Sequence, residues 1–265
     1  MKNNGGQPNN QAERTDQHQF LPRPLGRRSF LRRLGAGAAL LSPAVALLNG
    51  KRVMAQNGSN TLTSGDVAIL QFLAAAELLE QDLWQQYTEL ASGNPAFKAA
   101  QEAIDDDMPQ YIADNTDDEK SHARFLNQYL IANGQAPVNL NKFRTLPSSH
   151  ATGAKQIGRL TNLMNLTVDT SWWIRYREHG NPDFGDTFPQ LIEIVNFPGI
   201  PDEDFPVGSD MITAIADTAA FHFAMIEQGG SSLYCSFAPK ASALDMLTIL
   251  PCIGGTEVFH FAILA

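Results

Sequence analysis

Two short stretches of the chain each place a histidine three residues after a glutamate. TDDEKSHARFL contains Glu119 and His122, and GGTEVFHFAIL contains Glu257 and His260, about 140 positions further on. Residues three apart lie on one face of an α-helix, with β-carbons about 5–6 Å apart. A carboxylate and an imidazole at this spacing can bind one metal ion, or one ion and its neighbour. The two stretches are therefore candidates for the two halves of a two-metal centre.

One such pair by itself is weak evidence. The chain has 11 glutamates and 6 histidines, and by chance these give about a quarter of one match. Alone, either histidine would more often be an ordinary helix residue than a ligand. Two matches on helix-like segments are more specific, and they predict that two further helices each supply an inward-facing glutamate.

Two other glutamates lie among apolar neighbours. Glu77 is in AAAELLEQDLW, and Glu227 is in FHFAMIEQGGSSLY, which is almost uncharged. Glu80 lies one turn after Glu77 and is the alternative ligand on that helix. Buried glutamates need a partner, because an unpaired buried charge costs several kcal/mol. Two divalent cations would balance four carboxylates, and two neutral imidazoles would complete the set.

The segments that carry these residues are predicted to form four long helices. The first is rich in helix formers, lacks Pro and Gly, and repeats its apolar residues at the helical period. No alternating strand pattern of any length occurs. The four expected helices span residues 66–91, 108–131, 211–237 and 242–265.

About 75 residues, 135–210, connect the second and third expected helices. This connection contains a helix-like segment near 155–177 and then Pro/Gly-rich loops. Four helices with one long connection fit an all-α four-helix bundle whose path is up-down-down-up. The crossover would carry extra helical and loop structure. A plain up-down bundle with an irregular insertion is the alternative.

Two places interrupt the helical pattern. Gln228-Gly229-Gly230 resembles a helix stop, but the next residues stay apolar, so we expect the helix to continue and its glycines to allow a close approach. Pro251 removes a helical donor, so the last helix should kink or start late there. The chain ends five residues after His260, which is short for a fourth bundle helix.

Several other residues are interpreted first as structural. His222 lies five positions before Glu227, about 140° round the helix, and is the best spare ligand. Asp118 is expected on a solvated face, where it could hydrogen-bond a histidine. Cys235 and Cys252 form no metal motif, and pairing or free thiols are equally open. Aromatic residues of the crossover suggest a satellite core, with a substrate pocket less favoured. They are Trp172, Trp173, Phe184, Phe188, Phe197 and Phe205.

The first 55 residues differ in charge from the rest. They hold nine Lys/Arg and two acids, which leaves ten basic and 26 acidic residues elsewhere, a formal charge of −16. Because the rest of the chain is so acidic, it would be repelled by phosphate backbones, and nucleic acid is not expected as a partner. GRRSFLRRLGAGAALLSPAVALL is similar to a twin-arginine export signal, with Arg27 and Arg28 as the pair. The alternative is an amphipathic N-terminal membrane helix.

The export resemblance implies a removable signal peptide over 1–55 and a mature domain over 56–265. It implies the twin-arginine export machinery as a partner and a periplasmic or extracellular location. No stable membrane span is expected after processing, because the apolar run is short and contains Pro43.

ELLEQDLW, DDEKSHARFL, IEQGGSSLY and GGTEVFH together resemble the ferritin-like superfamily of di-metal carboxylate proteins, and especially its exported, desiccation-related branch. The resemblance covers residues 62–131 and 210–265. It implies a bundle that holds two Fe or Mn ions, with Glu119 and Glu257 as bridging candidates. The implied ligands are Glu77, Glu119, His122, Glu227, Glu257 and His260.

Three functions are compatible with a four-helix bundle that holds two metal ions. The first is an exported di-iron or di-manganese oxidoreductase that handles oxygen or peroxide or oxidises ferrous iron. The second is an iron-binding protein without turnover, and the third is a structural bundle associated with stress or desiccation. Whether the chain is an enzyme, and whether it forms a homo-oligomer, stays open, because ferritin-like bundles serve many chemistries.

Overall fold

The computed structural model describes residues 61–168 and 196–264. Within these ranges the chain forms helices and no strand, apart from one isolated antiparallel bridge between Leu146 and Arg159. The predicted all-α class is confirmed. The predicted signal peptide, residues 1–55, and residues 169–195 of the crossover lie outside the described residues.

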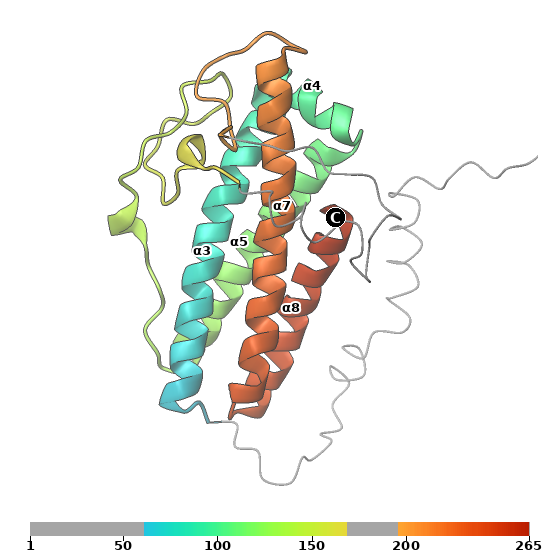
Figure 1. Ribbon diagram of the computed structural model, residues 1–265. Coiled ribbons are helices and arrows are strands. Elements are labelled where there is room, and N and C mark those ends of the chain that lie inside the picture. Colours follow the sequence, from blue (N-terminus) through green and yellow to red (C-terminus); the bar gives the residue numbers. More distant parts are fainter. Residues whose placement is uncertain (1–60, 169–195, 265) are drawn as a thin grey trace, which may run out of the picture. The chain divides into compact units, whose positions relative to one another are not determined.

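Four long helices form the bundle (Figure 1): α3 (Ser64–Gly93), α5 (Met108–Ala132), α7 (Asp210–Phe237) and α8 (Leu244–Leu264). Helix α3 packs along α5, and α7 packs along α8. The chain runs up α3, down α5, back along the outside of α3, down α7 and up α8. This is the predicted up-down-down-up path.

Helix α3 begins at a capping box. The Thr63 hydroxyl accepts a hydrogen bond from the Asp66 backbone N–H (3.2 Å), and the Asp66 carboxylate accepts one from the Thr63 N–H (2.9 Å). Asp66 also accepts a hydrogen bond from the Ser242 N–H (2.8 Å). One buried carboxylate therefore starts α3 and holds the residues that lead into α8.

The connection between the first two long helices contains a helix that the sequence did not predict. Helix α4 (Pro95–Ile104) is capped by Asn94, whose side chain accepts hydrogen bonds from two backbone N–H groups, and Pro95 occupies its first position. The expected helix near 155–177 is wrong for its described part, because residues 155–168 contain only the 3₁₀ turn η2 (Leu163–Asn165). Residues 169–177 lie outside the described residues.

Buried ionic contacts tie the crossover to α3. Asp82 accepts hydrogen bonds from the Arg144 guanidinium (2.7 Å) and from the Thr161 N–H (3.0 Å). Glu89 pairs with the guanidinium of Arg159, whose side chain is 1% exposed. These contacts explain why residues 155–168 do not form the helix that the sequence suggested. The segment lies along α3 because its polar groups bind to side chains of that helix.

The two predicted interruptions of the later helices do not stop them. Helix α7 runs through Gly229 and Gly230 to Phe237, as expected. Helix α8 begins at Leu244 and contains Pro251 in its interior, so it does not start late at the proline. A Cβ on Gly254 would lie 2.6 Å from the Cβ of Tyr234, which shows how closely α7 and α8 approach.

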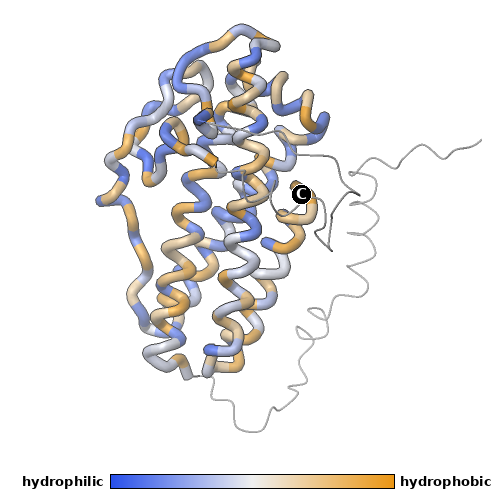
Figure 2. The backbone as a smooth tube through the Cα atoms, in the orientation of Figure 1, coloured by the Kyte–Doolittle hydropathy of each residue, from blue (hydrophilic) through white to orange (hydrophobic). Residues whose placement is uncertain are grey.

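The apolar core has two parts. One cluster includes Trp84, Ile112 and Phe223, and the other includes Leu73, Leu126 and Ile253. Figure 2 shows hydrophobic residues along the half of the bundle where α3 begins, which holds the second cluster. Along α3, α5 and α7 the chain passes from one cluster to the other, and the predicted metal ligands lie between them.

Helix α8 is the one helix among the described residues that is long and apolar enough to cross a membrane. A core helix of a bundle passes the same test. Glu257 and His260 lie on α8 and are buried inside the bundle. The face of α8 that carries them therefore packs against the other helices.

The Glu89–Arg159 pair provides a test of how the crossover is attached. Glu89→Gln would leave the Arg159 guanidinium buried without a counter-charge, which should lower the free energy of unfolding by about 3–5 kcal/mol. Urea unfolding measures this change. Glu102→Gln is the control, because Glu102 pairs with Lys98 at the surface and should matter by less than about 1 kcal/mol. Equal effects of the two variants would contradict the account.

Candidate metal centre

All six predicted ligands converge in the interior of the bundle. Their donor atoms form two groups within 4.8 Å, and the two groups share Glu119 and Glu257. Each of the six is at most 8% exposed. One group is Glu77, Glu119, His122 and Glu257, and the other is Glu119, Glu227, Glu257 and His260.

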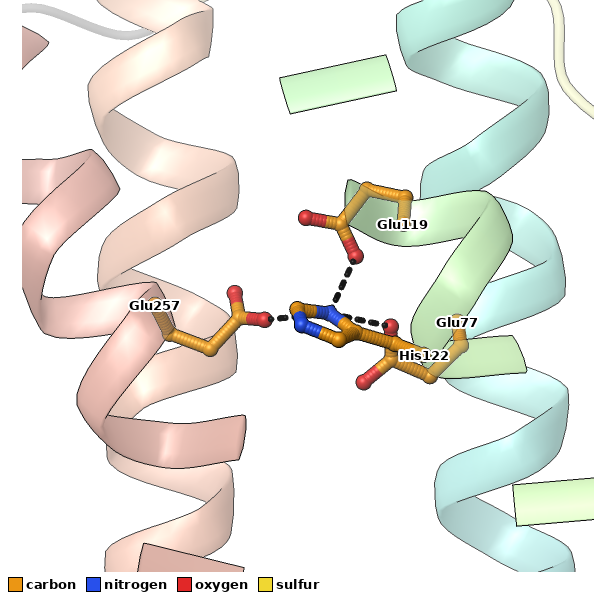
Figure 3. Close-up of side chains that lie close together, drawn as sticks. All are labelled: Glu77, Glu119, His122 and Glu257. Carbon is orange, nitrogen blue, oxygen red and sulfur yellow. Dashed lines mark hydrogen bonds and ion pairs between the residues drawn. The ribbon is translucent and has the colours of Figure 1, made fainter. Parts of the chain in front are cut away.

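His122 lies at the middle of the first group (Figure 3). Its Nδ1 is 3.2 Å from Glu119 Oε2. The same nitrogen is 3.3 Å from Glu77 Oε2 and 3.3 Å from Glu257 Oε1. Carboxylates from α3, α5 and α8 therefore meet at one nitrogen.

His260 repeats this arrangement in the second group. Its Nδ1 is 3.1 Å from Glu227 Oε2 and 3.6 Å from Glu119 Oε1. Its other ring nitrogen, Nε2, is 3.0 Å from Asp118 Oδ2. Asp118 thus reaches a histidine, as the sequence suggested, and does so across the bundle from α5 to α8.

Neighbouring residues hold the two outer carboxylates. The amide of Asn115 donates to Glu227 Oε1 (3.3 Å), and the buried hydroxyl of Tyr234 donates to Glu77 Oε1. Gly230 makes room for Glu257, because a Cβ there would overlap the Glu257 carboxylate. The roles of Asn115 and Tyr234 were not predicted from the sequence. The close approach expected at Gly229 and Gly230 occurs at Gly230, whereas a Cβ on Gly229 would meet nothing within 4 Å.

Four buried carboxylate oxygens accept no hydrogen bond of good geometry: Glu77 Oε2, Glu119 Oε1, and both oxygens of Glu257. Three of them have only an ion-pair contact of 3.3–3.6 Å with a histidine Nδ1, and Glu257 Oε2 has no such contact among the described residues. A buried acceptor without a donor costs about 1–3 kcal/mol, and more when it is charged. Three carboxylates and one imidazole per group are the donor types that suit iron and manganese. The residues present therefore fit a pair of such ions.

Protons compensate part of the negative charge when no metal is bound. Burial raises the pKa of Glu77 well above its ordinary value, against the opposing effect of the nearby His122 imidazole. Burial also raises the pKa of Glu227, to about 8, against its bond to His260. Glu119 behaves in the opposite way: burial would raise its pKa, but the hydrogen bond from His122 and the nearby imidazole of His260 lower it to about 2.

Both histidines favour the charged form. Burial alone would lower the pKa of His122, but the surrounding carboxylates, beginning with Glu119, raise it to about 12. Burial opposes the charge of His260 as well, and its contacts with the carboxylates of Asp118, Glu119 and Glu227 raise its pKa to about 12. The metal-free layer is thus neutralised by imidazolium ions and by protonated glutamates, which metal binding must displace.

The alternative ligands lie outside both groups. Glu80 is half-buried, and burial together with the charges of Glu77 and Glu119 raises its pKa well above normal. The Nδ1 atom of His222 is 2.8 Å from the hydroxyl of Tyr87. Cys235 and Cys252 are exposed free thiols and do not pair.

Comparison with models of protein families gives a match over most of the chain. The family model described as "Ferritin-like domain" matches residues 65–265. No curated protein and no solved structure matches the chain significantly.

Gly230 and Gly229 form a matched pair for testing the centre. A Cβ at Gly230 meets the Glu257 carboxylate, whereas a Cβ at Gly229 meets nothing within 4 Å. Gly230→Ala should displace Glu257 and weaken divalent metal binding by at least about tenfold. Gly229→Ala should bind metal normally and gain up to about 1 kcal/mol of helix stability. Isothermal titration with Mn²⁺ measures the affinities, and unchanged binding by Gly230→Ala would contradict this geometry.

The pKa shifts predict opposite pH effects with and without metal. The raised pKa values of Glu77, Glu227, His122 and His260 stabilise the metal-free fold at low pH. This stability is lost as pH rises from the unfolded-state values, 4.5 for glutamate and 6.5 for histidine, toward the folded-state values of about 8 for Glu227 and about 12 for the histidines. The melting temperature with chelator should therefore fall steadily from about pH 5 to about pH 9.

Metal ligands must be deprotonated, so the increase in melting temperature caused by Mn²⁺ should grow over the same range. Scanning calorimetry at several pH values measures both trends. The Glu119 shift does not interfere, because its contribution is lost only as pH falls below about 4.5 toward about 2. A metal-induced increase that shrinks with rising pH would contradict the assignment.

Proposed function

Because the chain belongs to the ferritin-like domain family, we propose that its bundle holds two Fe or Mn ions and acts as an exported oxidoreductase. The observation that carries the proposal is the set of four buried carboxylate oxygens without a hydrogen-bond donor. Three of them belong to Glu119 and Glu257, the residues that the two groups share, and cations are the partners that would satisfy them without adding side chains.

Six residues would hold the ions. Glu77 and His122 would belong to one ion, Glu227 and His260 to the other, and Glu119 and Glu257 to both, since the last two occur in each group. When bound, iron or manganese would supply the electron transfer needed to reduce dioxygen or peroxide, or to oxidise ferrous iron.

The chain's own residues contribute orientation and a dry environment. Tyr234 and Asn115 hold Glu77 and Glu227 by hydrogen bonds. The apolar clusters on either side, which include Trp84 and Leu126, keep the layer away from water. In such surroundings charge interactions are stronger than in water.

One observation supports a second candidate function. His122 and His260 lie within ion-pair distance of Glu119 and Glu227, so imidazolium ions could neutralise part of the polar layer in place of metal. A bundle of this kind could serve as a non-catalytic protein associated with stress or desiccation, or as an iron-binding protein without turnover.

Export is proposed from the N-terminal segment. Arg27 and Arg28, followed by a short apolar run, favour the twin-arginine route and a periplasmic or extracellular location. This route carries folded proteins, which suits a centre that would be loaded before export.

Assays on the metal-loaded protein separate the three functions. Under the favoured proposal, iron- or manganese-loaded protein consumes oxygen or peroxide, and Glu119→Gln/Glu257→Gln abolishes the activity, while Glu102→Gln retains it. Rapid uptake and release of ferrous iron without oxygen or peroxide consumption would favour the iron-binding function. A higher melting temperature with metal, without turnover or iron exchange, would favour the structural bundle.

A further inference from the structure

The two halves of the centre are related by a repeated pattern but differ at one position. Each half contributes a Glu-x-x-His pair, with Glu119 and His122 on α5, and Glu257 and His260 on α8. The residue before the glutamate is Asp118 in one half and Thr256 in the other. Asp118 carries a negative charge at this position and Thr256 does not.

Asp118 orients His260 from the side that faces away from the centre. Its Oδ2 lies 3.0 Å from Nε2, so Nε2 carries the proton and Nδ1 points at Glu227 and Glu119. A carboxylate behind a ligating histidine fixes the ring and increases its basicity, and such contacts are worth about 10–100-fold in metal affinity. Asp118 is itself half-exposed, with 51% of its side chain accessible.

His122 has no matching carboxylate. Thr256, at the equivalent position, donates its hydroxyl hydrogen bond to the Cys252 carbonyl of its own helix (3.3 Å). Within residues 61–168 and 196–264 the contacts of His122 all involve Nδ1. His122 is also more exposed than His260, at 8% against 3%.

From this asymmetry we propose that the two metal positions fill in order. The first ion binds at the position that includes His260. The second ion binds at the position that includes His122, with an affinity about 10–100-fold lower. Asp118 acts as a positioning residue for the first ion. The proposal rests on the two-metal centre proposed above and adds which half is stronger and why.

Repulsion between two ions would also separate the two binding steps, but it does not determine which half fills first. The identity of the stronger half depends on Asp118 and Thr256. The decisive variants therefore change these two residues and leave the six ligands in place, while variants of the ligands His122 and His260 identify which position each binding step fills.

The experiment is a titration of metal-free full-length chain with Mn²⁺, followed by electron paramagnetic resonance and calorimetry. One equivalent should give the six-line signal of an isolated ion, and the second should replace it with the signal of a coupled pair. His122→Gln should keep the tight first step and lose the second. His260→Gln should keep only weak binding.

Asp118→Asn removes the charge and should weaken the first step about 10–100-fold, so that the two steps merge. Asp117→Asn is the matched control, because Asp117 is 81% exposed, pairs only with Lys120 among the described residues, and should leave both steps unchanged. Thr256→Asp supplies the missing carboxylate and should strengthen the second step. Circular dichroism checks that each variant is folded.

The outcomes distinguish this inference from the proposed function. No Mn²⁺ binding by the unaltered chain would overturn the two-metal centre itself. A second outcome would overturn the ordered filling alone. The chain would bind two ions, but Asp118→Asn would leave the affinity of the first step unchanged and Thr256→Asp would leave that of the second unchanged. Tight single-ion binding that survives in His260→Gln and disappears in His122→Gln would reverse the proposed order.

Discussion

Burying four carboxylates at one level of a helical bundle is the constraint on which the rest of the structure depends. Glu77, Glu119, Glu227 and Glu257 come from four different helices and are each at most 1% exposed. Negative charges this close repel one another strongly away from water. The fold persists because His122, protons or bound cations compensate them. The polar layer therefore costs stability unless a positive partner is present, and such a partner is the most direct explanation for four buried glutamates at one level of the bundle.

The surrounding architecture serves this layer. Apolar clusters on both sides hold the helices in register, and Gly230 lets α7 approach the Glu257 carboxylate. The crossover brings the chain back so that α7 and α8 complete the centre, and it is tied to α3 through Asp82 and Glu89. These ties lie on the outside of the bundle and leave the layer between the clusters undisturbed.

Much of the bundle could be predicted from sequence, because helical periodicity and Glu-x-x-His spacing are local signals. They gave four helices to within a few residues and six side chains that the structure brings together. Prediction from local patterns failed where the structure of a segment depends on residues far away in the sequence. Residues 155–168 look helix-forming but follow α3, because Arg159 pairs with Glu89, 70 residues away in sequence. The contacts of Asn115 and Tyr234 had no signal in their own neighbourhoods. The predicted export signal and desiccation-related branch stay predictions.

The metal content of the mature protein tests the central claim most directly. The full-length chain would be expressed with its own N-terminal segment, and the exported product would be purified without chelators and analysed for metals. The account predicts about two Fe or Mn per chain, in keeping with the two groups of ligands. A product without metal, which also fails to bind ferrous or manganous ion under anaerobic conditions, would contradict it. The buried carboxylates would then be balanced by protons and imidazolium ions alone.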